Sequence, residues 1–263
     1  MLQNIEKLDN IFISYCVTAC NENEELFVLL SQLEGVLGVD TEIIVQTDSS
    51  KVTKDVLHVI NNHDISDSIK HVNFPLNGDF ATFKNNLFKH ARGEWIFQID
   101  ADELLNPYLL YNVKEMLEIN DNMEMIAVPR VNIVDGLTQD WINQWNWGIS
   151  KQDNAMGSTT EPISVYSDFY RVLETNNLIK EDYKVNDKGD SRIVVYHKPI
   201  INFPDYQTRI YRNKDSIRFK NKVHEVITGY SHYSAIPSDW DWCLLHVKDI
   251  NKQINQNEMY AKL

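Results

Sequence analysis

The stretch Gly93-Glu94-Trp95-Ile96-Phe97-Gln98-Ile99-Asp100-Ala101-Asp102-Glu103, GEWIFQIDADE, decides the fold. Residues 95–99 are rich in apolar and β-prone side chains, which predicts a buried strand. Three carboxylates follow at once, on Asp100, Asp102 and Glu103. Two aspartates this close repel each other when both are ionised, unless a cation lies beside them. The stretch therefore predicts a strand that ends at a cation site, and carboxylate oxygens suit Mg²⁺ or Mn²⁺.

The segments before this stretch alternate between strand-like and helix-like patterns. Strands are predicted at 11–17, 42–46, 70–73 and 95–99, and helices at 24–37, 53–61 and 80–91. This alternation indicates an α/β fold with a doubly wound, mostly parallel sheet. Ligands of such sheets bind outside the carboxyl ends of the strands. We therefore expect the polar residues at 18–22, 48–50 and 100–103 to share one crevice.

The sequence changes character after residue 130. Residues 131–199 are rich in Asn, Asp, Ser and aromatic residues with weak periodicity, and we interpret them as an elaboration over the sheet. Strand-like segments return at 192–197, 207–212 and 223–227, and a polar helix is expected from Lys248. We expect a single domain over 1–263, with halves at 1–130 and 131–263 and an insertion in the second half at about 131–199.

The composition excludes several classes of protein. No apolar run approaches the roughly 20 residues of a membrane span, and no secretory signal is evident. The three cysteines, Cys16, Cys20 and Cys243, lack CxxC spacing, so we predict neither a disulfide framework nor a zinc site and expect a cytoplasmic protein. The net charge of −13 opposes non-specific binding to nucleic acid.

One segment departs from this acidic character. Residues 192–222 contain eight Lys or Arg against two acids. Such a segment is either a solvated strand-and-turn region or a surface that faces an anion.

Several segments, taken together, resemble family 2 glycosyltransferases of the GT-A fold. They are CVTACNE at 16–22, EIIVQTDSS at 42–50, DFATFKN at 79–85 and the stretch 93–103, in the order and spacing of that family. The ending DADE is closest to a branch that includes lipopolysaccharide-core glucosyltransferases. NFPDYQTRIYR at 202–212 and VHE at 223–225 continue the resemblance, which extends to glycosyltransferases of tailed bacteriophages.

The resemblance implies a site for a nucleotide-diphospho sugar, most often UDP-linked, in the first half. The residues that would line the nucleotide sugar are Thr18, Ala19, Glu22, Asp48, Lys84, Asp100 and Ala101. Asp102 would hold Mn²⁺ or Mg²⁺ together with Asp100 and His246, although a lone histidine in an apolar stretch is often a core residue. The family commonly has an arginine where this chain has Lys84, which cannot form a bidentate contact with phosphate.

The second half would then be the acceptor side. By the resemblance Glu225 is the candidate general base of an inverting transfer, and His224 would position it or touch the diphosphate. The alternative is a strand end at which Glu225 is merely ion-paired. Trp141 and Trp145 are four residues apart, so on a helix they share a face that either packs on the core or stacks on an acceptor.

The acceptor stays open between two chemistries. The phage resemblance, the tryptophans and the basic segment, to which Arg209 belongs, point to a hydroxymethylated pyrimidine in DNA. The lipopolysaccharide branch points to a saccharide. A degenerate, non-catalytic nucleotide-sugar-binding module is a further alternative. A sugar nucleotidyltransferase is disfavoured because residues 18–22 contain no glycine, and a DxDxT phosphatase because Leu104 stands at its threonine position.

Overall fold

The first half of the chain forms the predicted parallel sheet. The computed structural model describes residues 11–148, 183–185, 194–196 and 200–260. The first four strands are β1 (Ile13–Ala19), β2 (Thr41–Asp48), β3 (Ile69–Phe74) and β4 (Trp95–Asp100). They pair in parallel in the order β3-β2-β1-β4. The predicted doubly wound α/β architecture is confirmed.

Two of the three helices between these strands begin at a side-chain cap that the sequence supplies. The connecting helices are α1 (Asn23–Glu34), α2 (Lys54–Asn62) and α3 (Phe80–Phe88). The side chain of Thr53 accepts a hydrogen bond from the backbone N–H of Val56 at the start of α2, and Asp79 does the same for Thr82 in α3. These caps satisfy backbone donors that the first turn of a helix leaves unpaired.

The second half completes the sheet on the other side of β4. The long strands on this side are β6 (Met125–Asp135), β9 (Ile200–Arg212) and β13 (Leu244–Asp249), and the short strands are β12 (Tyr233–Ala235) and, from the first half of the chain, β5 (Glu103–Leu105). The order of the main path is β3-β2-β1-β4-β9-β6-β13-β5, with β12 beside β6. β9 runs antiparallel to both β4 and β6, so β6 points the same way as β1, β2 and β4.

Several elements differ from the sequence predictions. β6 crosses residue 130 without a break, although weak periodicity was expected from residue 131. β13 and the helix α4 (Pro107–Ile119) were not identified from the sequence. β13 is buried over Leu244–Val247, and a strand buried on both faces shows no alternation. The predicted strand at 223–227 begins only at Val226, because residues 223–225 form a bend before β11 (Val226–Thr228).

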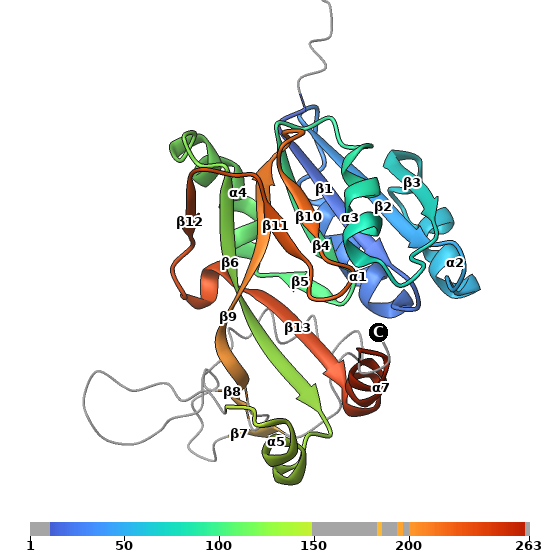
Figure 1. The fold of residues 1–263 in the computed structure, drawn as a ribbon, viewed down its shortest axis with the longest axis vertical. Helices are drawn as coiled ribbons and strands as arrows, with labels where there is room; N and C mark the ends of the chain where they lie inside the picture. The colour runs from blue at the N-terminus through green and yellow to red at the C-terminus, as the bar shows by residue number, and fades with distance from the viewer. Residues whose placement is uncertain (1–10, 149–182, 186–193, 197–199, 261–263) are drawn as a thin grey trace, which may run out of the picture.

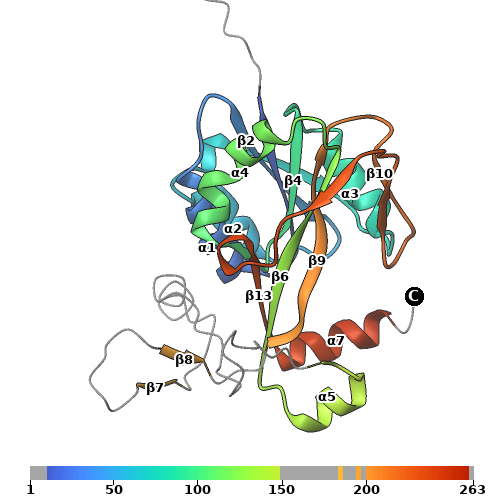
Figure 2. The ribbon, with the colours of Figure 1, turned by 90° about the vertical axis from the view of Figure 1, so that its left-hand side faces the viewer.

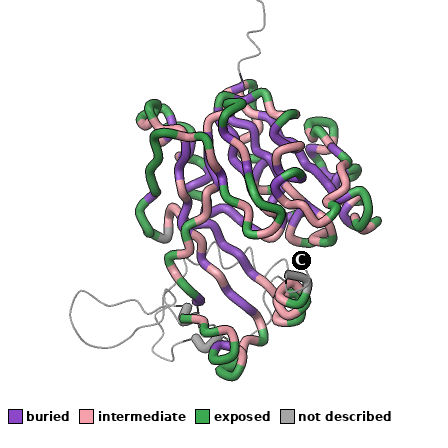
Figure 3. The backbone as a smooth tube through the Cα atoms, in the orientation of Figure 1, coloured by how far each residue is buried: buried purple, intermediate pink, exposed green. Residues whose placement is uncertain are grey.

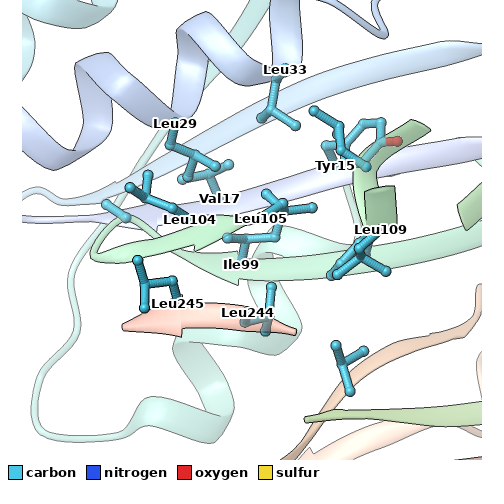
Figure 4. Packing of buried hydrophobic residues seen from close by; sticks show 14 of the residues in the cluster. Tyr15, Val17, Leu29, Leu33, Ile99, Leu104, Leu105, Leu109, Leu244 and Leu245 are labelled. Carbon is cyan, nitrogen blue, oxygen red and sulfur yellow. The ribbon is translucent and has the colours of Figure 1, made fainter. Parts of the chain in front are cut away.

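Helices cover both faces of the sheet. Figures 1 and 2 show α1, α2 and α4 on one face, and α3 with the hairpin of β10 (Arg218–Lys220) and β11 on the other. The first face buries leucines of α1 and α4 against Val17, Ile99 and β13, as Figure 4 shows. The second buries Phe88 of α3 against Tyr211 and Phe219. Figure 3 shows that buried residues follow the central strands while exposed ones lie on the periphery.

The ends of β6, β9 and β13 project beyond the first four strands. At this end lie α5 (Gln139–Trp145) and α7 (Ile250–Tyr260), below the main sheet in Figures 1 and 2. The predicted polar helix after Lys248 is therefore confirmed as α7. The remaining described elements are the short helices Ser66–Ser68 and Trp240–Trp242 and the antiparallel pair β7 (Tyr183–Val185) and β8 (Val194–Tyr196). Across the described ranges, no helix is long and apolar enough to span a membrane.

Gly93 allows β4 to approach β1. A Cβ atom at this position would lie 2.6 Å from the backbone nitrogen of Ser14 and 2.9 Å from the carbonyl carbon of Ile13. We expect Gly93→Ala to lower the free energy of unfolding by about 1–3 kcal/mol, because backbone atoms must shift. Urea denaturation measures the change. Gly38→Ala is the control, since its Cβ would meet only Asp40, at 3.6 Å; equal effects of the two substitutions would contradict this explanation.

Candidate active site

The ends of β1, β2 and β4 open into one cleft with a volume of about 780 Å³. Parallel pairing places Thr18 beside Asp100 and Ala19 beside Thr47. The sequence-predicted residues that line this cleft are Thr18, Ala19, Glu22, Asp48, Lys84, Asp100, Ala101, Asp102, Arg209, His224, Glu225 and His246. The expectation that the polar strand ends share one crevice is met for residues 18–22, Asp48 and residues 100–102, whereas Ser49, Ser50 and Glu103 do not line the cleft.

A buried arginine lies beneath the acids that end β4. Arg209 of β9 is 5% exposed, and its guanidinium donates hydrogen bonds to Gln98 at 2.6 Å, Asp100 at 2.7 Å and Glu103 at 2.5 Å. This position makes Arg209 a counter-charge to the acids, in place of the acceptor contact predicted from the sequence. Although burial raises the pKa of Asp100, Arg209 and Lys84 outweigh it and hold that pKa well below its usual value.

Glu103 does not face the cleft. Its side chain is fully buried and accepts hydrogen bonds from Arg209 and, at 2.8 Å, from Arg130 of β6. Arg130 also contacts Asp205 of β9 at 2.7 Å. Cations of the protein itself therefore offset the charges of Asp100 and Glu103, and the expectation that a divalent ion offsets the repulsion among all three acids is corrected for these two.

Asp102 and His246 face each other across the cleft, with Oδ2 and Nε2 3.2 Å apart. Asn132 donates its side-chain N–H to Asp205 at 2.8 Å, so its oxygen is the atom that faces Nδ1 of His246, also at 2.8 Å. Nδ1 must then carry the proton of a neutral imidazole. Burial lowers the pKa of His246 despite the nearby Asp102, which favours this neutral form.

The pair suits a divalent ion. With Nδ1 protonated, the lone pair of Nε2 points toward the Asp102 carboxylate, an arrangement that a shared cation stabilises. Within the described part of the chain, no three His, Cys, Asp or Glu side chains form a metal cluster on their own. Mg²⁺ and Mn²⁺ sites in nucleotide enzymes commonly use one or two protein ligands together with phosphate and water. The set of Asp102 and His246 fits that pattern.

Lys84 lies between Asp100 and Glu225 in the cleft. Its side chain is buried, and Nζ lies 2.8 Å from Glu225, 3.7 Å from Asp100 and 5.4 Å from the ring centroid of Phe219. Glu225 is thus ion-paired, as the alternative interpretation of this residue expected, yet it also lines the cleft. The neighbouring His224 is exposed and has a left-handed backbone with φ of 53°.

Asp48 presents an unused acceptor atom. Its Oδ1 accepts hydrogen bonds from the backbone N–H and hydroxyl of Ser50, at 3.1 and 2.6 Å, and from Leu76 N–H at 3.1 Å. Its Oδ2 is buried and has no hydrogen-bond partner among the residues that the structure describes. Burial raises the pKa of Asp48, but these hydrogen bonds hold it below the ordinary value, so the carboxylate is ionised. A buried acceptor of this kind is completed by an N–H group of a ligand.

The tryptophan prediction is met in part. Trp141 and Trp145 share a face of α5 and stack with centroids 4.8 Å apart, but they are half-buried and outside both hydrophobic cores. Neither lines the cleft, whereas Trp147 does. Further cleft residues that the sequence analysis did not identify are Arg130, Asn132, Asp205, Lys248 and Lys252.

Helix α7 closes one side of the cleft. Lys252 contacts Glu25 of α1 at 2.5 Å, and Lys248 donates to Gln256 at 2.7 Å while lying 3.7 Å from Asp102. The one local signal for Lys248 was its spacing, two residues after His246 on a strand, which places both on the same face.

Removal of the buried arginine should unfold the site. We expect Arg209→Met to lower the free energy of unfolding by about 3–5 kcal/mol, because Asp100 and Glu103 would lose a buried counter-charge. Lys114→Met, which breaks a half-exposed pair with Asp40, should cost at most about 1 kcal/mol. Urea denaturation at neutral pH compares the two variants. A loss for Arg209→Met no larger than for Lys114→Met would contradict the assigned role.

Comparisons with known proteins identify a sequence family and similar structures. The family model "Glycosyl transferase family 2" matches residues 14–180. The structure is similar to S. aureus TarS 1–349 (13% identity, 94% of this chain, 63% of that chain, TM-score 0.48). It is also similar to the same protein in complex with UDP-GlcNAc (15%, 90%, 59%, 0.49).

A third similar structure is glucosyl-3-phosphoglycerate synthase from Mycobacterium tuberculosis with Mn²⁺, UDP and glucosyl-3-phosphoglycerate (15% identity, 48% of this chain, 45% of that chain, TM-score 0.37). This chain therefore spans less than two thirds of the length of each of these structures. No sequence among the curated proteins matches it. Because the family model covers more than half of the 263 residues, the chain belongs to glycosyl transferase family 2.

Proposed function

We propose that the protein transfers a sugar from a nucleotide-diphospho sugar, UDP-linked, to an acceptor hydroxyl with inversion at the anomeric carbon. The observation that carries this proposal is one cleft in which an unpartnered Asp48 oxygen, the buried Lys84 ammonium and the Asp102–His246 pair converge. These groups match, in turn, a base N–H, a diphosphate and a divalent ion.

The donor would lie across the ends of β1, β2 and β4. Asp48 Oδ2 would accept the N3–H of uracil, which completes its hydrogen bonding. Thr18, Ala19, Glu22, Asp100 and Ala101 would line the ribose and diphosphate. Lys84 and Lys248 would supply positive charge to the diphosphate, and Lys84 is already positioned by Glu225 and Asp100.

Asp102 and His246 would hold Mn²⁺ or Mg²⁺. Such an ion, when bound, stabilises the negative charge that develops on the departing diphosphate. Asn132 fixes the imidazole by accepting the Nδ1–H at 2.8 Å, and this contact keeps Nε2 directed at Asp102. The Asp100 carboxylate contacts Arg209 and Thr18 at 2.7 Å each. It would therefore contribute to donor binding more by contacting the ribose than by contacting the ion.

Glu225 would act as the general base. It lies on the acceptor side of the cleft, opposite the acids of β4, and accepts from Lys84. The ion pair positions the carboxylate. Glu225 would take the proton of the acceptor hydroxyl while the hydroxyl oxygen attacks the anomeric carbon and the diphosphate leaves. His224, next to it, lines the same wall.

The acceptor that we propose is a saccharide hydroxyl. The structure describes six of the eight cations in the basic segment, and four of these six are ion-paired: Arg209, Arg212 with Glu94, Lys214 with Glu124, and Arg218 with Asp215. This leaves less positive charge for a phosphodiester backbone than the sequence suggested. A hydroxymethylated pyrimidine of phage DNA is the alternative, supported by the phage resemblance and the tryptophans.

Nucleotide binding can be measured without knowledge of the sugar. UDP with Mn²⁺, at about 100 times its Kd, should stabilise the protein by about 2.7 kcal/mol and raise Tm by about 5–10 °C. Asp102→Asn should lose the manganese-dependent part of the shift, while the exposed Asp215→Asn should retain all of it. An unchanged Tm for the wild-type protein, or an undiminished shift in Asp102→Asn, would contradict the proposed donor site.

The base can be tested once a donor and acceptor pair is known. A mass-spectrometric screen of nucleotide sugars against saccharides and hydroxymethylcytosine DNA identifies that pair. Glu225→Gln should then lower kcat on the order of 10²- to 10⁴-fold and leave the UDP-induced Tm shift intact, because glutamine still accepts from Lys84. Glu118→Gln, an exposed change on α4, is the control. A kcat within a few-fold of wild type would remove Glu225 from the role of base.

A further inference from the structure

Trp147 is held in a fixed position at the rim of the cleft. Helix α5 ends at Asn146, whose left-handed φ of 53° turns the chain, and the Trp147 N–H donates back to Ile142 at 3.0 Å. The Trp147 ring packs on Trp145 with centroids 4.7 Å apart, and Trp145 stacks on Trp141. The three rings therefore form one continuous aromatic cluster, stacked between Trp141 and Trp145 and tilted between Trp145 and Trp147, and Trp147 is the member that lines the cleft.

The segment after Trp147 is tied to the start of β9. Gly148 N–H donates to the side-chain oxygen of Asn202 at 2.8 Å, and Asn202 N–H donates to the Gly148 carbonyl at 2.9 Å. Asn202 itself has a left-handed φ of 55°. Two reciprocal hydrogen bonds fix the backbone on one side of Trp147, and the aromatic cluster fixes its side chain. Such pre-organisation reduces the entropy lost when a ligand binds.

One face of β9 connects the Trp147 ring at the rim of the cleft, here called the Trp147 ledge, to the acids that end β4. Ile201, Asp205, Gln207 and Arg209 alternate along the strand and all line the cleft. Gln207 donates to Asp205 at 2.8 Å, so the middle of this face offers amide and carboxylate groups. The seven residue-to-residue steps from Asn202 to Arg209 extend at most about 23 Å along the strand. The ledge is thus several sugar rings away from the buried end of the cleft.

We propose that the Trp147 ledge and the polar face of β9 form a distal acceptor subsite that binds a ring of an extended saccharide. This inference rests on the proposed transferase function and adds the length and chemistry of the acceptor. An indole face packs on the apolar face of a pyranose, while Asp205, Gln207 and Asn202 can bond hydroxyl groups along the strand.

Charge distinguishes a saccharide from a nucleic acid at this subsite. The cations among the described residues of this wall, Arg130 and Arg209, are held by Glu103, Asp205 and Asp100. A phosphodiester would have to displace these carboxylates in order to bind the two guanidinium groups. A neutral, hydroxyl-rich chain can bind without displacing these carboxylates.

The test is a binding series with acceptor length as the variable. α- and β-linked oligosaccharides of glucose, galactose and rhamnose, one to six rings long, are arrayed and probed with the protein in the presence of UDP and Mn²⁺. We expect wild-type affinity to rise with length for one linkage series. Trp147→Ala should lose about tenfold in affinity for the longer members and little for the monosaccharide. The affinity of Trp147→Phe for the longer members should lie between those of the wild-type protein and Trp147→Ala.

The controls separate this inference from the donor site. Tyr111→Ala removes a 63% exposed aromatic residue of α4 outside the cleft and should bind like wild type. The UDP-induced Tm shift, measured on the same samples, reports the donor site and should be unchanged in Trp147→Ala and Trp147→Phe. A missing shift in the wild-type protein would point to failure of the proposed function itself.

Two results would overturn the subsite. One is an intact UDP shift with a length dependence that is the same in wild type, Trp147→Ala and Trp147→Phe. The other is an intact UDP shift without binding of any saccharide, including the case in which hydroxymethylcytosine single-stranded DNA binds in a Trp147-dependent manner. That second case would assign the ledge to a nucleobase.

Discussion

The arrangement depends on one buried cation, the guanidinium of Arg209. It lies between Gln98, Asp100 and Glu103 at 2.5–2.7 Å and is joined by Arg130, which donates to the same Oε1 atom of Glu103 as Arg209. A buried carboxylate without such a partner would be protonated or would unfold its surroundings. Because β9 supplies Arg209, the antiparallel strand in the middle of the sheet is what permits β4 to end in three acids.

This division of charge leaves one acid with a different environment. Asp100 and Glu103 are committed to protein cations, whereas Asp102 faces an imidazole whose orientation is fixed by Asn132 and Asp205. The strands that hold these groups, β6, β9 and β13, project past the ends of β1, β2 and β4 (Figure 1). The projection creates one cleft, lined on one side by the ends of β1, β2 and β4 and on the other by β6, β9 and β13.

The sequence predicted the first half of this picture well. β1 to β4 and their helices have local periodicity, and Thr18, Asp48, Asp100 and Asp102 follow strand ends that a parallel sheet must bring together. The counter-charges were out of reach, because Arg209 is 109 residues from Asp100 and no local pattern records which strand lies beside β4. β6 and β13 were missed since doubly buried strands do not alternate, and Trp147 was passed over because helical spacing drew attention to Trp141 and Trp145.

The most direct measurement is a crystal structure with Mn²⁺ and UDP, with anomalous scattering recorded at the manganese edge. The account predicts one anomalous peak in the cleft, within about 2.3 Å of Asp102 and His246. It also predicts that Arg209 keeps its contacts with Asp100 and Glu103. A manganese ion bridging Asp100 and Glu103 with Arg209 displaced, or a nucleotide bound without manganese near Asp102, would contradict it.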